Sequence, residues 1–282
     1  MRVLILGASG MLGHALVDVL GGTDHQVYAS SRATITFPVA ESVRLISHID
    51  VLQTDDLLRA FEIAHPDVVI NAVGLIKQLE AAQDPAQTVP INTVLPHRLA
   101  SLCAACNARL VHVSTDCVFN GVQGAYVESD VADARDLYGL SKYLGEVSGR
   151  TNAITLRTSI IGRERGTANG LVEWFLGAGP TVKGYTNAIF SGLPTVVLAE
   201  LIRDVILPRP DLWGLYHVSA EPISKLELIR LISDVYGISR TIEPADEPRI
   251  DRSLNSDRFR ETTGYSPQSW PAMIEHMRKM QG

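Results

Sequence analysis

The chain has 282 residues, of which 46% are apolar and 20% charged, and its formal net charge is −6. This composition is typical of a compact soluble protein that can bury a sizeable core. The acidic balance and the absence of a basic cluster argue against nucleic acid as a partner. No apolar stretch is long enough to span a bilayer and no leader pattern precedes the first apolar run, so we expect no membrane partner and a cytoplasmic location.

Strand-like apolar runs alternate with segments of helical length through the first part of the chain. The predicted strands are residues 3–6, 26–29, 44–49, 68–71, 110–113 and 153–156, and the predicted helices are residues 11–20, 55–64, 93–105 and 137–149. This alternation predicts an α/β fold with a doubly wound parallel sheet. Beyond about residue 158 the connections become rich in glycine and proline. We therefore expect one domain over residues 1–158 and a smaller lobe formed mainly by residues 159–282, with some segments returning to the first domain.

The three cysteines, an odd number, do not make a disulfide framework. Cys103 and Cys106 form a C-x-x-C motif inside a predicted helix, and no second metal-binding cluster follows it. We therefore expect these cysteines to pack in the fold rather than to carry redox chemistry, and we expect no metal site.

Three glycines at a spacing of three residues follow the first predicted strand and open the first predicted helix. Small residues there let the main chain approach a pyrophosphate, whose charge then rests on the N–H groups and the positive end of the helix. The alternative is a tight strand-to-helix turn without a ligand. The loop predicts dinucleotide binding by Gly7, Ser9, Gly10, Met11, Leu12 and Gly13.

The choice of cofactor depends on the end of the second predicted strand, where the chain reads Ser30-Ser31-Arg32. An acidic residue in this place holds a ribose 2′-hydroxyl, whereas an arginine accommodates a 2′-phosphate. Ser31 and Arg32 therefore favour NADPH, with NADH as the alternative. A solvated loop cation is the other interpretation of Arg32.

Three further segments end predicted parallel strands, where open α/β sheets place their ligands. Asp50-Val51 could flank the adenine, although an aspartate at this place also fits a helix N-cap. Asn71-Ala72-Val73 supplies small residues and one amide beside the cofactor. Ser114-Thr115-Asp116 supplies two hydroxyls that could bond a substrate oxygen, or that cap the next turn.

Tyr138 and Lys142 stand four residues apart in a predicted helix, so the phenol and the ammonium share one face. A cation held there favours the phenolate, and such a tyrosine can exchange a proton with an alcohol or ketone near neutral pH. The pair alone is also typical of a solvated helix face. Together with the glycine loop it predicts a nucleotide-dependent oxidoreductase in which both residues also contact the cofactor.

These motifs resemble those of the extended short-chain dehydrogenases, most closely the dTDP-4-dehydrorhamnose reductase group. The resemblance is carried by the glycine loop, Asn71-Ala72, the run 114–119, the Tyr138-x-x-x-Lys142 pair and Leu144-Gly145-Glu146. It covers nearly the whole chain. It implies a Rossmann domain with a smaller carboxy-terminal sugar-nucleotide lobe, and a catalytic triad of Thr115, Tyr138 and Lys142.

The same resemblance implies that Asn92 supports the active site and that Arg157-Thr158-Ser159 lies near the nicotinamide and the substrate. The sequence departs from the family pattern at Cys117, where a tyrosine is usual, and in residues 75–80 and 183–192. Substrate-facing positions are thus altered while chemical positions are intact. This combination suggests a related 4-keto-6-deoxy sugar nucleotide, such as a UDP-linked amino sugar, and does not secure the assignment to the rhamnose precursor.

We predict substrate contacts for Lys77, Thr115, Asp116, Asn187 and Phe190. Lys77 would pair with the diphosphate, although a surface lysine is an equally good interpretation. Asn187 would bond a hydroxyl or N-acetyl group and Phe190 would cover an apolar sugar face, although Phe190 also suits a core position.

The sequence therefore predicts a reductase that moves hydride from NADPH to a ring ketone of a nucleotide sugar, in the synthesis of polysaccharide precursors. A nucleotide-sugar epimerase or dehydratase is one alternative. A non-enzymatic regulatory subunit, such as that of methionine adenosyltransferase, is another, and the intact Thr115, Tyr138 and Lys142 argue against it. The substrate stereochemistry and the nucleotide base stay open. So does the oligomeric state, for which a homodimer is among the states allowed.

Overall fold

The computed structural model describes residues 1–165 and 168–280, which form two compact units. The first unit comprises Met1–Thr115, Arg135–Leu156 and Ala199–Leu215, and the second comprises Asp116–Ala134, Arg157–Leu198 and Tyr216–Gly282. Each unit is thus assembled from three separate stretches of chain. The domain division expected at residue 158 stays a prediction. Within the described residues no helix is both long and apolar enough to cross a membrane, and the cytoplasmic location also stays a prediction.

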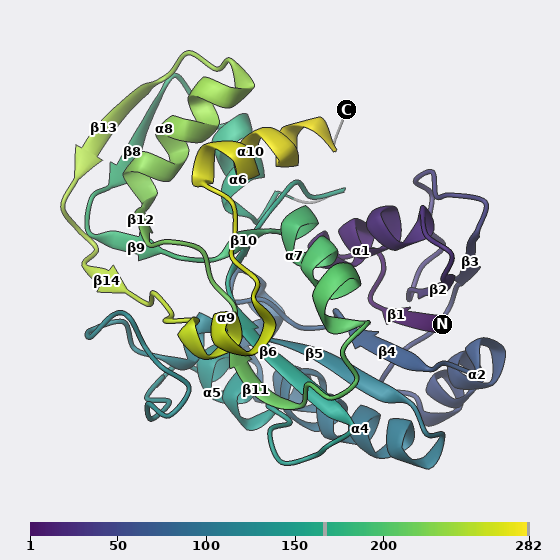
Figure 1. Cartoon of the computed structure of the whole chain (residues 1–282). Helices are drawn as coiled ribbons and strands as arrows, with labels where there is room; N and C mark the ends of the chain where they lie inside the picture. Colours follow the sequence, from purple (N-terminus) through teal and green to yellow (C-terminus); the bar gives the residue numbers. More distant parts are fainter. Residues whose placement is uncertain (166–167, 281–282) are drawn as a thin grey trace. The chain divides into compact units, whose positions relative to one another are not determined.

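A seven-stranded sheet with the order β11-β6-β5-β4-β1-β2-β3 organises the fold (Figure 1). The pairs β1–β2, β2–β3, β1–β4 and β4–β5 are all parallel. This arrangement confirms the predicted α/β class and the doubly wound sheet. The strands are β1 Arg2–Leu6, β2 Gln26–Ser30, β3 Val43–Ile46, β4 Val68–Asn71, β5 Arg109–Thr115, β6 Ala153–Thr158 and β11 Gly214–His217.

The register of the central strands brings their carboxyl ends to one edge of the sheet. Leu6 at the end of β1 pairs with Ser30 of β2 and with Asn71 of β4, and Asn71 in turn pairs with His112 of β5. Ligands of open α/β sheets bind at this edge. The side chains of Val3 to Leu6 are completely buried, as expected for a parallel strand that is covered on both faces.

The helices of the first unit include α1, which leads away from the glycine loop, and α5, which carries the tyrosine and lysine. Their bounds are α1 Met11–Gly21, α2 Thr54–Ala64, η1 Glu80–Gln83, α3 Pro85–Thr88, η2 Val89–Val94, α4 Leu95–Ala105, α5 Leu137–Leu144 and η4 Ile202–Ile206. Helix α7 Thr195–Leu201 begins in the second unit and ends in the first. The helix predicted over 93–105 begins as an α-helix at Leu95, because its first two residues belong to the π-helical turn η2. The helix predicted over 137–149 ends at Leu144.

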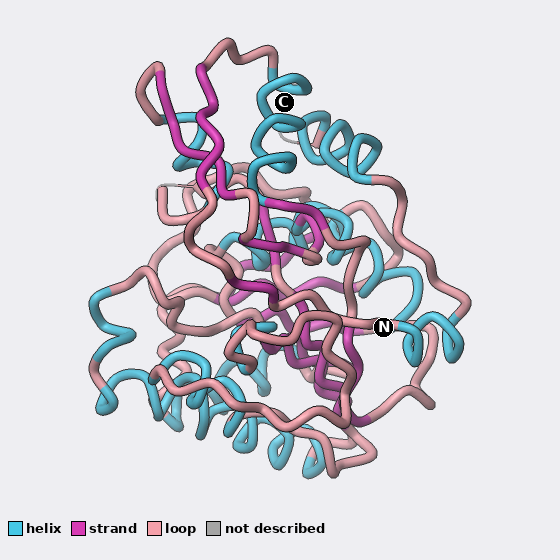
Figure 2. The backbone as a smooth tube through the Cα atoms, turned by 90° about the vertical axis from the view of Figure 1, so that its left-hand side faces the viewer, coloured by secondary structure: helices cyan, strands magenta, loops and turns pink. Residues whose placement is uncertain are grey.

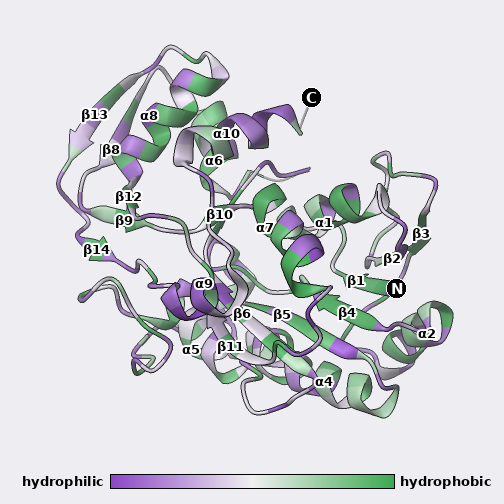
Figure 3. Ribbon diagram, in the orientation of Figure 1, coloured by the Kyte–Doolittle hydropathy of each residue, from purple (hydrophilic) through white to green (hydrophobic). Residues whose placement is uncertain are grey.

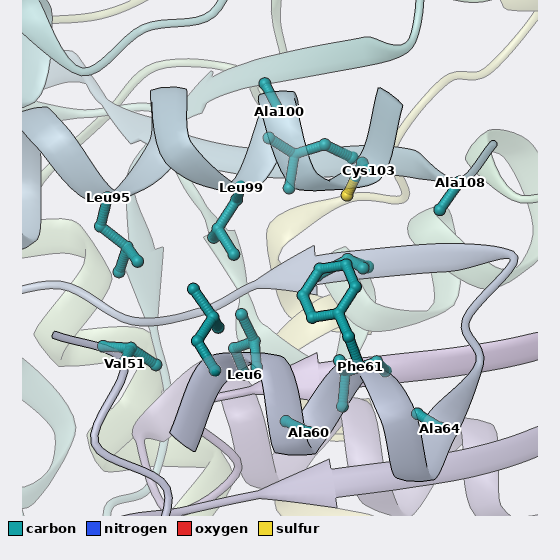
Figure 4. Packing of buried hydrophobic residues seen from close by; sticks show 14 of the residues in the cluster. Leu6, Val51, Ala60, Phe61, Ala64, Leu95, Leu99, Ala100, Cys103 and Ala108 are labelled. Atoms are coloured by element: carbon teal, nitrogen blue, oxygen red, sulfur yellow. The ribbon is translucent and has the colours of Figure 1, made fainter. Parts of the chain in front are cut away.

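One face of the sheet packs against α2 and α4, as Figure 4 shows. Phe61 of α2 and Leu99 of α4 lie in the same buried cluster as Leu6 of β1 and Leu110 of β5. Cys103 belongs to this cluster, and burial raises the pKa of its thiol to about 12. Figure 3 shows the apolar character of the central strands as hydrophobic colour along β1 and β4. The cluster stabilises the strand ends that carry the site because removing such buried side chains costs several kcal/mol each.

The second unit consists of small sheets and helices joined by long connections (Figure 2). Its sheets have the orders β10-β7, β12-β9-β14 and β13-β8. Helix α8 begins with a capping box between Ser224 and Glu227. The bounds are η3 Asp116–Val118, β7 Ile160–Ile161, α6 Leu171–Gly177, β8 Thr181–Tyr185, β9 Ala188–Phe190, β10 Leu193–Pro194, β12 Ile223–Ser224, α8 Lys225–Tyr236, β13 Thr241–Ala245, β14 Ile250–Asp251, α9 Asp257–Thr263 and α10 Trp270–Lys279.

Candidate active site

The glycine loop between β1 and α1 requires glycine at two of its positions. Gly7 has a φ of 84°, and a Cβ on it would lie 2.9 Å from Cγ2 of Val73. A Cβ on Gly13 would lie 2.0 Å from the carbonyl oxygen of Gly7. The start of α1 has Gly10 as N-cap and no side-chain cap, while Ser9 and Gly10 are exposed. This loop fits a pyrophosphate because its N–H groups and the helix dipole are available to an anion.

The end of β2 presents the residues predicted to choose the cofactor. Ser31 is buried, and its hydroxyl donates to the carbonyl oxygen of Ala33. Arg32 is exposed and makes no hydrogen bond or ion pair with another described residue. The exposed guanidinium is therefore available to a phosphate at this edge.

Asp50 and Val51 stand at the next strand end. Asp50 Oδ1 accepts a hydrogen bond from the backbone N–H of Leu52 at 3.0 Å, and the backbone N–H of Asp50 donates to Asp56 Oδ2 at 3.0 Å. The N-cap of α2 is Gln53, so Asp50 shapes its own turn and does not cap the helix. Val51 is buried in the cluster beneath the sheet edge. Contact of both residues with the cofactor stays a prediction.

Asn71, which lies at the end of β4, has its amide engaged inside the protein. Its Oδ1 accepts from the N–H of Val73 at 3.1 Å, and its Nδ2 lies 3.1 Å from Nδ1 of His112. Since Oδ1 is the acceptor for Val73, Nδ2 donates to the imidazole. The amide therefore sets the backbone course of Ala72 and Val73, which line Gly7. His112, which sequence reasoning did not identify, thus ties β5 to this turn.

The three residues of the predicted triad all belong to the first unit. Thr115 ends β5 and is buried, while Tyr138 and Lys142 lie one turn apart on α5, which packs against β5. Tyr138 is half-buried, whereas only 6% of Lys142 is exposed. The Lys142 ammonium donates to the carbonyl oxygen of Val113 at 2.8 Å. Helix α5 starts at this place because Asp136 Oδ1 accepts from the N–H of Gly139 at 3.0 Å.

Burial lowers the pKa of Lys142 to about 8, and the nearby carboxylate of Glu146 opposes this effect. A lysine with this pKa is mostly protonated at neutral pH and yet close to releasing its proton. A buried cation one turn from a phenol stabilises the phenolate more strongly than a solvated one, because the local dielectric is low. The arrangement can therefore support proton transfer by Tyr138.

Asn92 lies in the π-helical turn η2 and is hydrogen-bonded to α5, while its support of the active site stays a prediction. Its Nδ2 donates to the carbonyl oxygen of Leu75 at 3.0 Å and to Ser141 Oγ at 3.3 Å, while its Oδ1 accepts from the N–H of Leu75 at 2.9 Å. The amide thus joins the loop after β4 to the tyrosine-bearing helix. Thr93 adds a hydrogen bond of 2.8 Å to the carbonyl oxygen of Ser141.

The residues predicted to contact the substrate lie in different places. Lys77 is exposed and pairs with Asp136 Oδ2 at 3.1 Å. Asp116, buried at the start of η3, directly follows Thr115. In the second unit, Asn187 Nδ2 donates to the carbonyl oxygen of Asp246 at 2.9 Å. Phe190 is 7% exposed and its ring centre lies 5.7 Å from that of Trp270, which supports the core interpretation of this residue.

Sequence reasoning missed the pair formed by Ser114 and Glu146. Ser114 Oγ donates to Glu146 Oε1 at 2.7 Å. Glu146 follows Lys142 by four residues, so a charge pattern was present in the sequence. Only the fold shows that the carboxylate turns toward β5.

A family model described as RmlD substrate binding domain matches residues 1–281. A dTDP-4-dehydrorhamnose reductase of Aggregatibacter actinomycetemcomitans is 26% identical over 304 residues and aligns over 98% of each chain. The spore coat polysaccharide biosynthesis protein SpsK of Bacillus subtilis is 28% identical, over 99% of this chain and 97% of the relative. A dTDP-4-dehydrorhamnose reductase of Mycolicibacterium smegmatis is 32% identical over a shorter alignment, 57% of this chain and 46% of that protein.

Among solved structures, the dTDP-4-dehydrorhamnose reductase of Bacillus anthracis in complex with NADP has a similar fold, with a TM-score of 0.81 at 20% identity. The likeness covers 100% of this chain and 99% of the other. The resemblance inferred from the motifs is thereby confirmed. Since the family model matches almost the whole chain, this protein belongs to the RmlD substrate binding domain family.

Proposed function

We propose that this protein is an NADPH-dependent reductase of a 4-keto-6-deoxy nucleotide sugar, and that it works in the synthesis of polysaccharide precursors. The observation that carries the proposal is the pairing of half-buried Tyr138 with buried Lys142, whose ammonium is bonded to the strand end that bears Thr115. A buried lysine is costly to keep charged, and a binding protein has no need for one beside a phenol.

The residues divide the reaction between them. NADPH, when bound, supplies the hydride, with the pyrophosphate at the glycine loop and the 2′-phosphate at Arg32. Tyr138 gives its proton to the ketone oxygen as charge develops there, and Thr115 donates a hydrogen bond to the same oxygen. Lys142 lowers the pKa of the phenol and holds the nicotinamide ribose.

The identity of the nucleotide sugar is a more specific proposal than the type of reaction. Departures from the family pattern at Cys117 and in residues 183–192 support a nucleotide sugar other than the rhamnose precursor, such as a UDP-linked amino sugar. Lys77 would exchange its partner Asp136 for the substrate diphosphate, and Asn187 would bond a sugar substituent. Both side chains already have protein partners, so binding must replace these contacts.

The test is NADPH consumption, measured by absorbance, with a panel of dTDP- and UDP-linked 4-keto sugars and with Tyr138→Phe as the control. Turnover with at least one sugar that Tyr138→Phe abolishes supports the reductase. Interconversion of sugars without net NADPH consumption would identify an epimerase or dehydratase instead, because these enzymes return the hydride within one turnover. No reaction with any sugar would favour the regulatory subunit.

We also propose that the protein forms a homodimer through α5 and η2. Leu140, Tyr143 and Leu144 of α5 are 42%, 42% and 57% exposed, and Val94 of the adjoining η2 is 44% exposed. Apolar side chains gathered on two packed helices favour a protein partner. Light scattering should give the mass of two chains, and Leu144→Lys should shift it toward one chain. A wild-type mass of one chain would contradict the dimer.

A further inference from the structure

One carboxylate holds the strand end that serves both Lys142 and Thr115. Ser114 stands between Val113, whose carbonyl oxygen accepts from the Lys142 ammonium at 2.8 Å, and Thr115. The Ser114 hydroxyl donates to Glu146 Oε1 at 2.7 Å, and only 4% of Ser114 is exposed. A hydrogen bond to a charged group in such a place contributes more than a neutral one. The Ser114–Glu146 bond thus fixes the stretch of β5 backbone that carries the carbonyl oxygen of Val113 and the hydroxyl of Thr115.

The end of α5 explains why Glu146 can reach Ser114. The N–H of Gly145 donates to the carbonyl oxygens of Ser141 and Lys142 at 3.2 and 3.1 Å, and α5 ends at Leu144. A Cβ on Gly145 would lie 1.9 Å from the carbonyl oxygen of Asn92, so the close approach of η2 requires glycine. The turn thus directs Glu146 toward β5 instead of onto the exposed face of a longer helix.

The charges around Lys142 can be followed element by element. His112 of β5 is buried, and its pKa is lowered well below its ordinary value by burial and by Lys142, so it is neutral. On α4, His97 Nε2 lies 2.8 Å from the carbonyl oxygen of Leu144. Glu80 of η1 is exposed, and Asp136 at the start of α5 is paired with Lys77. Neither α3 nor η2 carries a titratable side chain, and Tyr138 shares the helix face with Lys142.

We propose that Glu146 is a positioning residue of the active site, which holds the end of β5 through Ser114 and thereby the backbone carbonyl that accepts from the Lys142 ammonium. The role rests on the reductase function proposed above, because it acts on the lysine that serves the catalytic tyrosine. Burial lowers the pKa of Lys142, and Glu146 is the carboxylate that raises it again. Without this charge more of the lysine is neutral at working pH, and the phenol of Tyr138 loses its cation.

The experiment measures the titration of Lys142 directly. The chain has five lysines, so a spectrum of protein labelled with ¹³C-lysine is simple, and Lys142→Arg assigns the signal. In Glu146→Gln, which keeps the size and an acceptor oxygen, the pKa of Lys142 should fall by roughly half a unit or more. The alkaline limb of the pH profile of kcat/KM should move toward acid by the same amount, while the KM for NADPH stays unchanged.

Two further variants separate charge from structure. Ser114→Ala removes the hydrogen bond but leaves the carboxylate, so kcat should fall severalfold with a smaller shift of the Lys142 titration. Glu80→Gln removes an exposed acid from η1, which also packs against α5, and should change neither readout. Circular dichroism shows whether each variant is folded.

An unchanged Lys142 titration in folded Glu146→Gln would overturn the proposal, and so would an equal shift in Glu80→Gln. If the proposed reductase function is wrong, the measurements give a different combination of results. If no nucleotide sugar consumes NADPH but the Lys142 pKa still falls in Glu146→Gln, the effect of Glu146 on the lysine stands and the assigned reaction is wrong.

Discussion

Two regions that the sequence marks as functional differ in how their polar side chains are used. At the end of β5 and on α5, Lys142 is a buried cation. Within the part of the chain that the structure describes, its ammonium donates to one backbone carbonyl, and the carboxylate of Glu146 favours its charged form. In residues 183–192 of the second unit, the side chain of Asn187 already has a backbone acceptor and Phe190 packs against Trp270. In the first region, keeping the Lys142 ammonium charged in a buried place costs desolvation free energy that folding alone does not require. In the second region, the Asn187 amide and the Phe190 ring have their contacts within the folded unit.

This difference between the two regions decides which functional assignment the structure supports. A buried charge is retained against its desolvation cost, so its presence indicates chemistry. A satisfied amide or a packed ring indicates only that the segment is folded. The reaction type is therefore supported by the structure of the first region, and the substrate assignment depends on experiments on the second.

The largest expected effect is the loss of turnover in Tyr138→Phe, because the ring still packs and only the proton donor is removed. General acid catalysis contributes roughly 10²- to 10⁴-fold, so kcat should fall by at least this order. NADPH affinity, measured by fluorescence titration, should be nearly unchanged. A variant that keeps more than about a tenth of the wild-type rate would show that Tyr138 is not the acid.

The cost of the buried cation can be measured through the pH dependence of stability. The pKa of Lys142 is lowered from 10.5 to about 8 in the folded protein. Between these two values the unfolded chain binds more protons than the folded one, so this group makes stability rise with pH. Lys142→Met lacks the effect.

Urea denaturation should therefore show wild type gaining about 2 kcal/mol relative to Lys142→Met between pH 7 and pH 10. Lys279→Met, which removes an exposed lysine of α10, is the matched control. A constant difference between wild type and Lys142→Met at the two pH values would mean that the lysine is not destabilised by burial, and the contrast between the two regions would disappear.

The third effect concerns the cofactor and is smaller. Arg32→Ala should weaken NADPH binding by about 10- to 100-fold, because a charge-assisted contact to a phosphate contributes about 1.5 to 3 kcal/mol. NADH lacks the 2′-phosphate and serves as the control ligand. Equal losses for both cofactors in calorimetric titrations would show that Arg32 does not contact this phosphate.

Local patterns were sufficient for much of this fold. The central strands are continuous apolar runs because both of their faces are covered, and the glycine loop and the Tyr138–Lys142 pair follow from short spacings. Contacts between distant residues were not accessible in this way. The predicted helix over 137–149 ends at Leu144, and Gly145, its C-cap, lies against the backbone of Asn92, which is far away in the sequence.

The same limit applies to the site. The bonds of Ser114 to Glu146 and of Asn71 to His112 join residues that are 32 and 41 positions apart. Residue type alone gives no reason to pair them. Phe190 shows the converse, since an aromatic residue in a divergent segment suits a sugar face and a core position equally well, and the structure places it against Trp270.

The smallest expected effect decides whether the second region takes part in substrate recognition. Asn187 Nδ2 donates to the carbonyl oxygen of Asp246 at 2.9 Å, and the neighbouring Thr186 Oγ1 donates to Asp246 Oδ1 at 3.0 Å. Asn187→Ala should lower kcat/KM for the true nucleotide sugar by roughly tenfold, because a site built around hydrogen bonds discriminates against a missing partner. NADPH affinity should be unchanged.

Thr186→Val is the matched control, since it removes a comparable bond to the same segment without removing the amide. Equal losses of kcat/KM and of thermal stability in both variants would assign Asn187 to the structure of the second unit, whereas a loss confined to Asn187→Ala would assign it to the substrate.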